Sequence, residues 1–374
     1  MKVAIVGLRG FPQVQGGVEK HVESLSPLLV QQGVAVTVYA RSPYMRHLHQ
    51  PCWQGVRLRR IWCPTGKSTE TLVHTFLSVW AAFFEGHRVI HFQAIGPSFF
   101  VPMARLLGMR VVMTHHGCDY QRQKWGWLAR CYLRAAEALA VRYAHQVIVI
   151  SHSIQRFVDR RYGAKSVWLP NGVSAFPDHA IEPERLRPFD LPPGQFILHV
   201  GRFVPEKRHH DLIDAFVQAD LPGWKLVFVG AADHEDAYSS SVLARATGKV
   251  RFVGRQMPAQ LLQLYAQCGL FVLPSSHEGL PIALLEAMSL GAPFLVSDID
   301  AHTELELPAA CYFPLGDVAT LAQRIRQRTA SPNLDRSYWA QWARERFDWC
   351  AIAERTATLY RQLVRADSAV QRAD

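Results

Sequence analysis

One stretch of the chain, PSSHEGLPIALLEAM at residues 274–288, lies between two apolar runs at residues 270–273 and 294–296. The apolar runs predict buried strands, and the glycine and second proline of the stretch mark the place where a loop becomes a helix. Two carboxylates, Glu278 and Glu286, are separated by seven residues, so one falls in the loop and the other in the helix. The stretch therefore predicts a strand–loop–helix–strand unit with acids at the mouth of the helix, where α/β folds bind ligands.

The same alternation of short apolar runs and helical stretches extends through the whole chain. Strand-like runs occur at residues 3–6, 34–39, 89–92, 110–114 and 146–150, and again at residues 196–201, 225–229 and 250–253. Such runs of Val, Ile and Leu between helices are typical of parallel sheets covered on both faces. We therefore expect an α/β protein with two doubly wound, Rossmann-like domains facing each other across a cleft. The domains are expected at residues 1–175 and 195–349, with a proline-rich linker at 176–194.

Length and composition agree with a two-domain globular protein. The chain has 374 residues, of which 49% are hydrophobic and 19% charged. Its seven cysteines show no ligand-like spacing, which disfavours a disulfide framework or a structural zinc site and favours a reducing compartment. The N-terminus reads as a first strand, and the longest apolar run, residues 72–84, is shorter than the ~20 residues that span a bilayer.

Positive charge is concentrated in the first half of the chain. Residues 1–175 hold 21 Lys and Arg against 7 Asp and Glu, whereas residues 176–374 hold 20 against 24. This asymmetry indicates a polyanionic partner, either an anionic membrane surface or nucleic acid, unless the basic face is only solvated. The segment at residues 121–143 mixes basic and aromatic side chains, and it fits either an interfacial amphipathic helix or a helix buried on a sheet.

Two motifs in the first half are candidates for ligand binding. Gly16 and Gly17 open a helix directly after the first strand, where a ligand can approach the backbone closely and an anion is favoured. A plain strand-to-helix turn is the alternative. His115, His116 and Asp119 follow another strand, where a histidine is placed to bind a polar substrate or serves only as a structural residue.

Two motifs in the second half carry opposite charges. Arg202 and Lys207 follow the first strand of that half, and the pair could clamp a diphosphate. Glu278 and Glu286 could accept hydrogen bonds from sugar hydroxyls, while backbone N–H groups at residues 279–281 could hold phosphate. A solvated basic pair, a capping glutamate and a helix-face glutamate are the alternatives.

Taken in order, these motifs resemble the retaining glycosyltransferases of family 4 (GT4), which have the GT-B fold. The resemblance covers nearly the whole chain, including an ending that is similar to the family's closing helix, which crosses back to the N-terminal domain. The segments that carry it are GGVE at 16–19, HHGCD at 115–119, PNGV at 170–173, GRFVPEK at 201–207, RFVG at 251–254, EGLPIALLEAM at 278–288 and FDWCAIAERTATLYRQL at 347–363.

The resemblance implies roles for residues at the donor. Arg202 and Lys207 would bind the donor diphosphate and stabilise the leaving nucleotide, and Glu286 would hold the ribose. Glu278 would hold the donor sugar together with the backbone of three residues, Gly279, Leu280 and Pro281. The side chains of Arg251 and Phe252 would border the base.

It also implies roles for residues of the N-terminal domain. His116 would contact the sugar and belong to the catalytic set with Glu278, Arg202 and Lys207. Gly17, with Gly16, would lie near the phosphates and the acceptor, and we assign Asp119 to the acceptor. Asn171, in the PNGV segment, is expected to be structural.

The expected enzyme is a retaining, metal-independent glycosyltransferase whose only cofactor-like requirement is its nucleotide-diphosphate sugar. UDP-sugars are the first candidates for the donor and GDP-mannose the second. The expected acceptor is a glycan, lipid-linked, in surface polysaccharide synthesis. The expected location is cytoplasmic and peripheral on the inner face of the cytoplasmic membrane, with no nucleic-acid partner. A nucleotide-sugar epimerase, a phosphorylase of the same fold and a non-catalytic nucleotide-sugar-binding protein are the alternatives.

Overall fold

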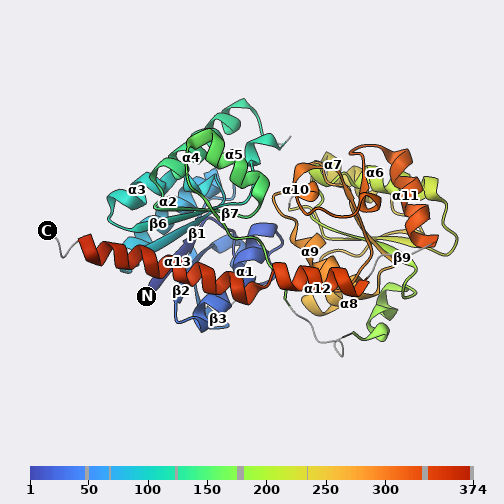
Figure 1. Cartoon of the computed structure of the whole chain (residues 1–374), viewed down its shortest axis with the longest axis horizontal. Coiled ribbons are helices and arrows are strands. Elements are labelled where there is room, and N and C mark those ends of the chain that lie inside the picture. The colour runs from blue at the N-terminus through green and yellow to red at the C-terminus, as the bar shows by residue number, and fades with distance from the viewer. Residues whose placement is uncertain are drawn as a thin grey trace. The chain divides into compact units, whose positions relative to one another are not determined.

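The computed structural model describes residues 1–46, 50–66, 69–122, 125–174, 181–233, 235–330 and 336–370. The chain divides into two compact units (Figure 1). Unit 1 contains Met1–Asn171 and Trp349–Asp374, and unit 2 contains Gly172–Asp348. Each unit is built on its own sheet and its own hydrophobic core.

The sheet of unit 1 has strand order β3-β4-β2-β1-β5-β6-β7-β8. Neighbouring strands are parallel except for β3 and β4, which form an antiparallel hairpin at one edge. The strands are β1 (Lys2–Val6), β2 (Ala35–Arg41), β3 (Cys52–Trp53), β4 (Val56–Ile61), β5 (Val89–Gln93), β6 (Arg110–His115), β7 (Gln146–Val149) and β8 (Val167–Trp168).

Helices cover both faces of this sheet. Its helices are α1 (Gly17–Gln31), α2 (Thr69–Phe84), α3 (Val101–Leu106), α4 (Trp127–Tyr143), α5 (His152–Tyr162) and α13 (Trp349–Val370), with short 3₁₀ turns η1 (Ser42–Met45), η2 (Pro97–Phe100) and η3 (Asp119–Gln121). Successive strands are added toward one edge of the sheet up to β4 and toward the other edge from β5 on. Right-handed crossovers therefore place α1 on one face and α2 to α5 on the other. Figure 1 shows α13 on one side of the sheet and α3, α4 and α5 on the opposite side.

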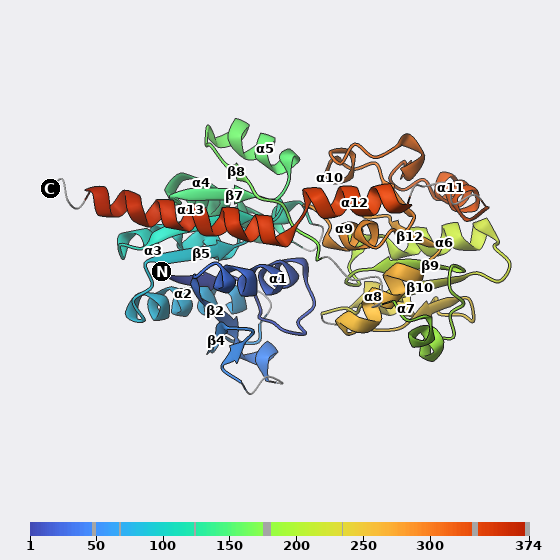
Figure 2. The ribbon, with the colours of Figure 1, turned by 60° about the horizontal axis from the view of Figure 1, so that its bottom comes forward.

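The last helix, α13, completes the core of unit 1 although it follows unit 2 in sequence. It packs along α1 (Figure 1, Figure 2) and buries Ile352, Ala353 and Tyr360. The Tyr360 hydroxyl lies 2.5 Å from Nδ1 of His91 on β5. The predicted return of the closing helix to the N-terminal domain is therefore confirmed.

The sheet of unit 2 is entirely parallel, with order β11-β10-β9-β12-β13-β14. Its strands are β9 (Phe196–Val200), β10 (Lys225–Val229), β11 (Val250–Phe252), β12 (Leu270–Leu273), β13 (Phe294–Ser297) and β14 (Tyr312–Phe313). Its helices are α6 (His209–Ala219), α7 (Ala237–Leu243), α8 (Pro258–Gln267), α9 (Ile282–Ser289), α10 (Asp300–Thr303), α11 (Val318–Ala330) and α12 (Arg336–Arg346), with turns η5 (Pro183–Phe189), η6 (Pro205–Lys207) and η7 (Ala309–Cys311).

The predicted α/β fold class is confirmed, and each predicted strand forms within two residues of its expected ends. The prediction missed the edge strands β3, β4, β8 and β14. Three of them are two residues long, and β4 carries three arginines that mask its alternation of buried and exposed positions. The expected linker contains the turn η5, while its residues 176–180 lie outside the described part of the chain.

Candidate active site

Unit 2 brings the predicted cationic and acidic motifs together at one point of its sheet. Chain order reverses at β9, which lies between β10 and β12, and such a reversal opens a crevice at the carboxyl ends of the strands. Lys207 lies in η6 after β9, and Glu278 lies in the loop after β12. Lys207 Nζ is 2.5 Å from Glu278 Oε1. The fold therefore joins two motifs that are 71 positions apart.

The environment of Glu278 keeps it ionised. Its side chain is 13% exposed and that of Lys207 is 18% exposed. Burial alone raises the pKa of Glu278, but the charge and hydrogen bond of Lys207 outweigh burial and lower this pKa to about 2. At neutral pH the residue is a carboxylate that accepts hydrogen bonds and has no proton to donate.

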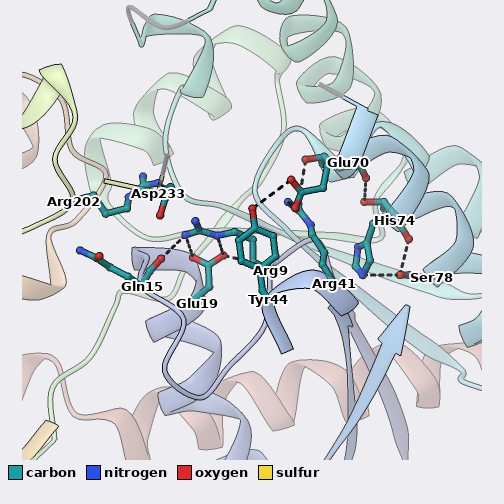
Figure 3. A network of polar contacts seen from close by, with 12 residues as sticks. Arg9, Gln15, Glu19, Arg41, Tyr44, Glu70, His74, Ser78, Arg202 and Asp233 are labelled. Carbon is teal, nitrogen blue, oxygen red and sulfur yellow. Dashed lines mark hydrogen bonds and ion pairs between the residues drawn. The ribbon is translucent and has the colours of Figure 1, made fainter. Parts of the chain in front are cut away.

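Arg202, the other predicted cation, forms an ion pair with an acidic residue that was not among the predicted site residues. Its Nη1 donates to Oδ2 of Asp233 at 2.7 Å, as the close view in Figure 3 shows. Asp233 follows β10, and Arg255 Nη2 lies 4.0 Å from its other oxygen. Two arginines therefore converge on one carboxylate beside the crevice.

The opening stretch of sequence forms a loop and the helix α9. Pro281 is the N-cap, one position before the helix, and with Leu280 it is buried, whereas Gly279 is partly exposed. Backbone N–H groups in the first turn of a helix lack intrahelical acceptors and favour an anion. Glu286 lies in the second turn, next to Tyr265, where burial and the Glu286 carboxylate raise the pKa of the tyrosine.

The side chains of Arg251 and Phe252 contact other parts of unit 2. Arg251 Nη2 donates to Asp190 Oδ2 at 3.1 Å, and Phe252 stacks on Phe228 with ring centroids 5.1 Å apart. Both residues line a hollow of about 580 Å³ between η5 and β11. Their predicted place beside the base stays a prediction.

In unit 1 the paired glycines begin α1 at the reversal point next to β1. Gly16 is the N-cap with φ +156°, and an added Cβ would lie 1.9 Å from Glu19 Oε2. Glu19 is itself held by Arg9, whose Nε donates to its Oε1 at 3.0 Å (Figure 3). At Gly17, apart from the adjacent residues and the backbone of α1 itself, no atom of the described residues lies within 4 Å of an added Cβ. The two glycines therefore have different surroundings: the first is confined by an ion pair and the second borders open space.

His116 is half-buried at the end of β6, and its Nε2 lies 2.8 Å from Gln93 Oε1. With the amide oxygen as the acceptor, Nε2 carries the proton and Nδ1 is the acceptor of the neutral ring. Burial, followed by the charges of His21, His91 and His115, holds the pKa of His116 well below its ordinary value. The imidazole is therefore neutral at physiological pH.

Gln93 is a site candidate that the sequence reading missed. It is fully buried at the end of β5, and its amide Nε2 has no hydrogen-bond partner within the described part of the chain. The sequence feature that could have indicated Gln93 is its position: it is a polar residue at the end of a run that predicts a buried strand. The structure places this amide in contact with His116.

The neighbouring His115 has a different setting. Its Nε2 lies 2.8 Å from Glu137 Oε1, and its Nδ1 accepts the Gly117 N–H. With Cys118 these residues place three possible metal-ligating atoms within 4.8 Å of one another. However, Glu137 also accepts from two tyrosines, and burial raises the pKa of Cys118 to about 11. We assign this cluster to the support of the 115–119 loop.

The remaining predicted residues of unit 1 have local partners. Asp119 begins η3 and pairs with Arg122 at 3.1 Å. Asn171 is buried, and its Oδ1 lies 2.8 Å from Nδ1 of His21, whose pKa burial lowers to about 4. The contact of Asn171 agrees with the structural role expected for it.

Two family models together match most of the chain. The model described as Glycosyltransferase Family 4 matches residues 15–175, and the model described as Glycosyl transferases group 1 matches residues 188–346. The first match ends four residues after Asn171, the last residue of the first segment of unit 1.

The relatives in sequence include a glycogen synthase and a mannosyltransferase. Glycogen synthase of Mycobacterium tuberculosis is 29% identical over 277 residues, which are 70% of this chain and 65% of that one. The chain thus matches just under two thirds of that relative's length. Phosphatidyl-myo-inositol mannosyltransferase of Mycobacterium leprae is 25% identical over 99% of both chains.

Solved structures share the fold. Sucrose-phosphate synthase from Thermosynechococcus elongatus superposes with a TM-score of 0.82 at 23% identity, covering 98% of this chain and 99% of that one. Anabaena HepE in complex with UDP and glucose gives 0.78 at 19% identity, covering 97% and 100%. These likenesses establish the GT-B type of fold.

Proposed function

Because the chain belongs to the family 4 glycosyltransferases, we propose that it moves a sugar from a nucleotide-diphosphate donor to a glycan acceptor with retention of configuration. One observation supports the proposal independently of family membership. The Lys207–Glu278 pair stands where the order of strands reverses, with Arg202 in the same loop as Lys207. A cation pair and a carboxylate at this point suit a diphosphate and a sugar.

Each predicted site residue of unit 2 has a proposed part in holding the donor. Arg202, Lys207 and the first turn of α9 bind the diphosphate, while Glu278 and the backbone of residues 279–281 bind the sugar. Glu286 binds the ribose, and Arg251 with Phe252 borders the base. This assignment is supported by the low pKa of Glu278, since an ionised carboxylate is a strong acceptor for sugar hydroxyls.

The proposed chemistry is substitution on the face of the leaving group. Negative charge develops on the diphosphate as the glycosidic bond breaks, and Arg202 and Lys207 are placed to stabilise it, as a metal ion does elsewhere. Glu278 is paired with Lys207 and assigned to the sugar hydroxyls, so we give it no nucleophilic role. His116 contributes a neutral imidazole from unit 1 and accepts a hydrogen bond from the sugar through Nδ1.

For the donor we propose a UDP-sugar first and GDP-mannose second. The first choice is supported by HepE, whose structure contains UDP and glucose. The mannose of the second choice is supported by the mannosyltransferase of Mycobacterium leprae, and its GDP by a Komagataeibacter xylinus relative named for GDP-mannose. Both choices lead to one screen, in which UDP-glucose and GDP-mannose are added separately and the unfolding temperature is followed. If neither of these compounds and no other nucleotide sugar raises the unfolding temperature, the donor-binding proposal is contradicted.

For the acceptor we propose a lipid-linked glycan in surface polysaccharide assembly, reached by a cytoplasmic enzyme bound peripherally to the membrane. The proposal is supported by the basic N-terminal half, with Asp119, Gly16 and Gly17 assigned to the acceptor side. No helix within the described ranges has the length and apolar character that crossing a membrane requires.

The Glu278→Ala variant tests the catalytic assignment. We expect sugar transfer to fall by roughly 100-fold or more, because an interaction made with the reacting sugar is lost. Binding of UDP, measured by calorimetry, should be retained. Glu345→Ala, which removes an exposed glutamate of α12, is the matched control and should leave both unchanged.

Two outcomes would favour other activities on this fold. Release of free nucleotide by the wild-type protein without any acceptor would indicate an epimerase or a hydrolase. Binding of a nucleotide sugar with no turnover for any glycan acceptor, in the wild type and in Glu278→Ala alike, would indicate a non-catalytic binding protein.

A further inference from the structure

Helix α2 directs its polar residues inward and its apolar residues outward. Four of its six buried residues are polar, namely Glu70, His74, Thr75 and Ser78. Its exposed positions instead carry large apolar side chains at helical spacing: Phe76 (42% exposed), Leu77 (36%), Phe83 (38%) and Phe84 (77%). A surface helix normally has the opposite pattern. The outer face of α2 is therefore suited to an apolar partner.

Contacts on the inner side fix this orientation of α2. Arg41 Nη1 donates to Glu70 Oε1 at 2.8 Å, and Tyr44 lies 3.4 Å from the other oxygen (Figure 3). Ser78 donates to the His74 carbonyl at 2.7 Å. Burial, followed by the charge of Arg41, lowers the pKa of His74 to about 3, so its ring is neutral. These hydrogen bonds hold the polar side of α2 against the domain, and rotation of the helix would break them.

The apolar surface continues from α2 to α4 through η2. Ring centroids are 5.9 Å apart for Phe76 and Phe100, 5.5 Å for Phe100 and Phe99, and 5.2 Å for Phe99 and Tyr132 of α4. One turn before Tyr132 on the same side of α4 lies Leu128, which is 74% exposed. We call this surface the α2–α4 face, defined by Phe76, Leu77, Phe83, Phe84, Phe99 and Leu128.

The exposed charges in the segment that carries the α2–α4 face are almost all positive. The described part of residues 69–145 holds four carboxylates: two, Glu70 and Glu137, are buried and the others are paired with arginines. In contrast, Arg88, Arg105, Arg130, Arg134 and Arg142 are exposed. The Lys124 of the predicted basic segment lies outside the described residues.

This combination selects one kind of partner. Exposed aromatic and aliphatic side chains, with the exposed Arg105 and Arg142 on the adjoining helices α3 and α4, suit the interface of a bilayer that contains anionic lipids. A second copy of this face would bring like charges together and is disfavoured. We propose that the α2–α4 face is the surface by which the protein docks on an anionic membrane. The proposal rests on the proposed membrane-linked function and adds the docking surface to it.

Vesicle flotation of the full chain tests this proposal. We expect binding to vesicles that contain phosphatidylglycerol, much weaker binding to pure phosphatidylcholine, and weakening as salt is raised. The double variant Leu77→Ser/Phe84→Ser should lower the partition constant by roughly tenfold or more, since two exposed apolar anchors are lost. The variant Arg142→Glu, four helical turns after Leu128 on the same side of α4, should lower it severalfold, because an exposed cation becomes an anion.

Matched variants and a parallel measurement make the result specific. Val217→Ser, at a 63% exposed apolar position of α6, and Lys249→Glu, at an exposed cation of unit 2, should leave flotation unchanged. UDP-glucose binding, measured in solution on every variant, reports the donor site separately. Vesicle binding without sugar transfer would leave docking intact and contradict the proposed function.

Three results would overturn the docking proposal. The first is equal vesicle binding by the wild type and Leu77→Ser/Phe84→Ser. The second is a protein that transfers sugar but does not bind anionic vesicles. The third is a wild-type dimer, seen by sedimentation, that the Leu77→Ser/Phe84→Ser variant does not form. The last result would assign the α2–α4 face to a second copy of the chain.

Discussion

At the scale of single residues, chemistry is concentrated at strand ends. Gln93 and His116 lie at the carboxyl ends of their strands, and Lys207 and Glu278 lie in the loops that follow β9 and β12. Pairing there sets the protonation state: Lys207 keeps Glu278 ionised, and Gln93 orients the neutral ring of His116. Fixed protonation states are what electrostatic stabilisation of a leaving group requires.

Gln93→Glu should change the pH dependence of transfer. A carboxylate beside His116 favours the imidazolium, so the pKa of His116 rises from its depressed value. Activity that needs the neutral ring is then lost as the pH falls through the raised pKa, whereas the wild type keeps a neutral ring there. The pH profile of kcat/KM should show an acid limb shifted upward by a unit or more.

Gln93→Met is the control for this shift, because it removes the hydrogen bond to His116 without adding a charge. It should lower activity at every pH and leave the position of the acid limb unchanged. An identical acid limb in Gln93→Glu and the wild type would show that Gln93 does not act on His116.

At the scale of elements, the start of α1 separates a structural glycine from one available to a ligand. Arg9 and Glu19 form a mostly buried ion pair, with side chains 12% and 8% exposed. This pair occupies the space where a Cβ on Gly16 would lie, whereas Gly17 borders open space. At Gly16 a side chain is excluded by the ion pair, whereas at Gly17 the absence of a side chain leaves the backbone accessible.

Gly16→Ala should affect stability, whereas Gly17→Ala should affect ligand binding. The first forces Glu19 away from Arg9 and should lower the free energy of unfolding by about 1–3 kcal/mol, as measured in urea. The second should keep stability within about 0.5 kcal/mol but raise KM for the donor or acceptor. Equal stability of the two variants would refute the ion-pair confinement of Gly16.

At the scale of the whole molecule, two separate cores hold the fold. The core of unit 1 includes Tyr360 from α13, and that of unit 2 includes Phe216 from α6. We expect calorimetry to resolve two unfolding transitions. UDP should raise only the transition of unit 2, because a ligand stabilises the part that binds it.

Conservative core variants assign the transitions. Tyr360→Phe removes the hydroxyl that contacts His91, and Phe216→Leu leaves a small cavity, so each should lower one transition by about 2–4 °C. A shift of both transitions by either variant would contradict the independence of the two cores.

Local patterns in the sequence were enough to predict the α/β fold class and the central strands. Apolar runs mark buried parallel strands because such strands are covered on both faces, and glycine and proline mark the loops that follow them. The stretch at residues 274–288 accordingly forms the predicted loop and helix. Short edge strands such as β8 and β14 gave no such signal, since two residues carry no period.

Other features depend on which segments the sheets bring together. The pairing of Lys207 with Glu278, the brace of Asp233 on Arg202 and the contact of Gln93 with His116 join residues 23 to 71 positions apart. The outward apolar face of α2 also appeared only in the structure, because its apolar run alone would fit a buried helix equally well. A periodic pattern defines the faces of an element, but burial is decided by the neighbours that pack against each face.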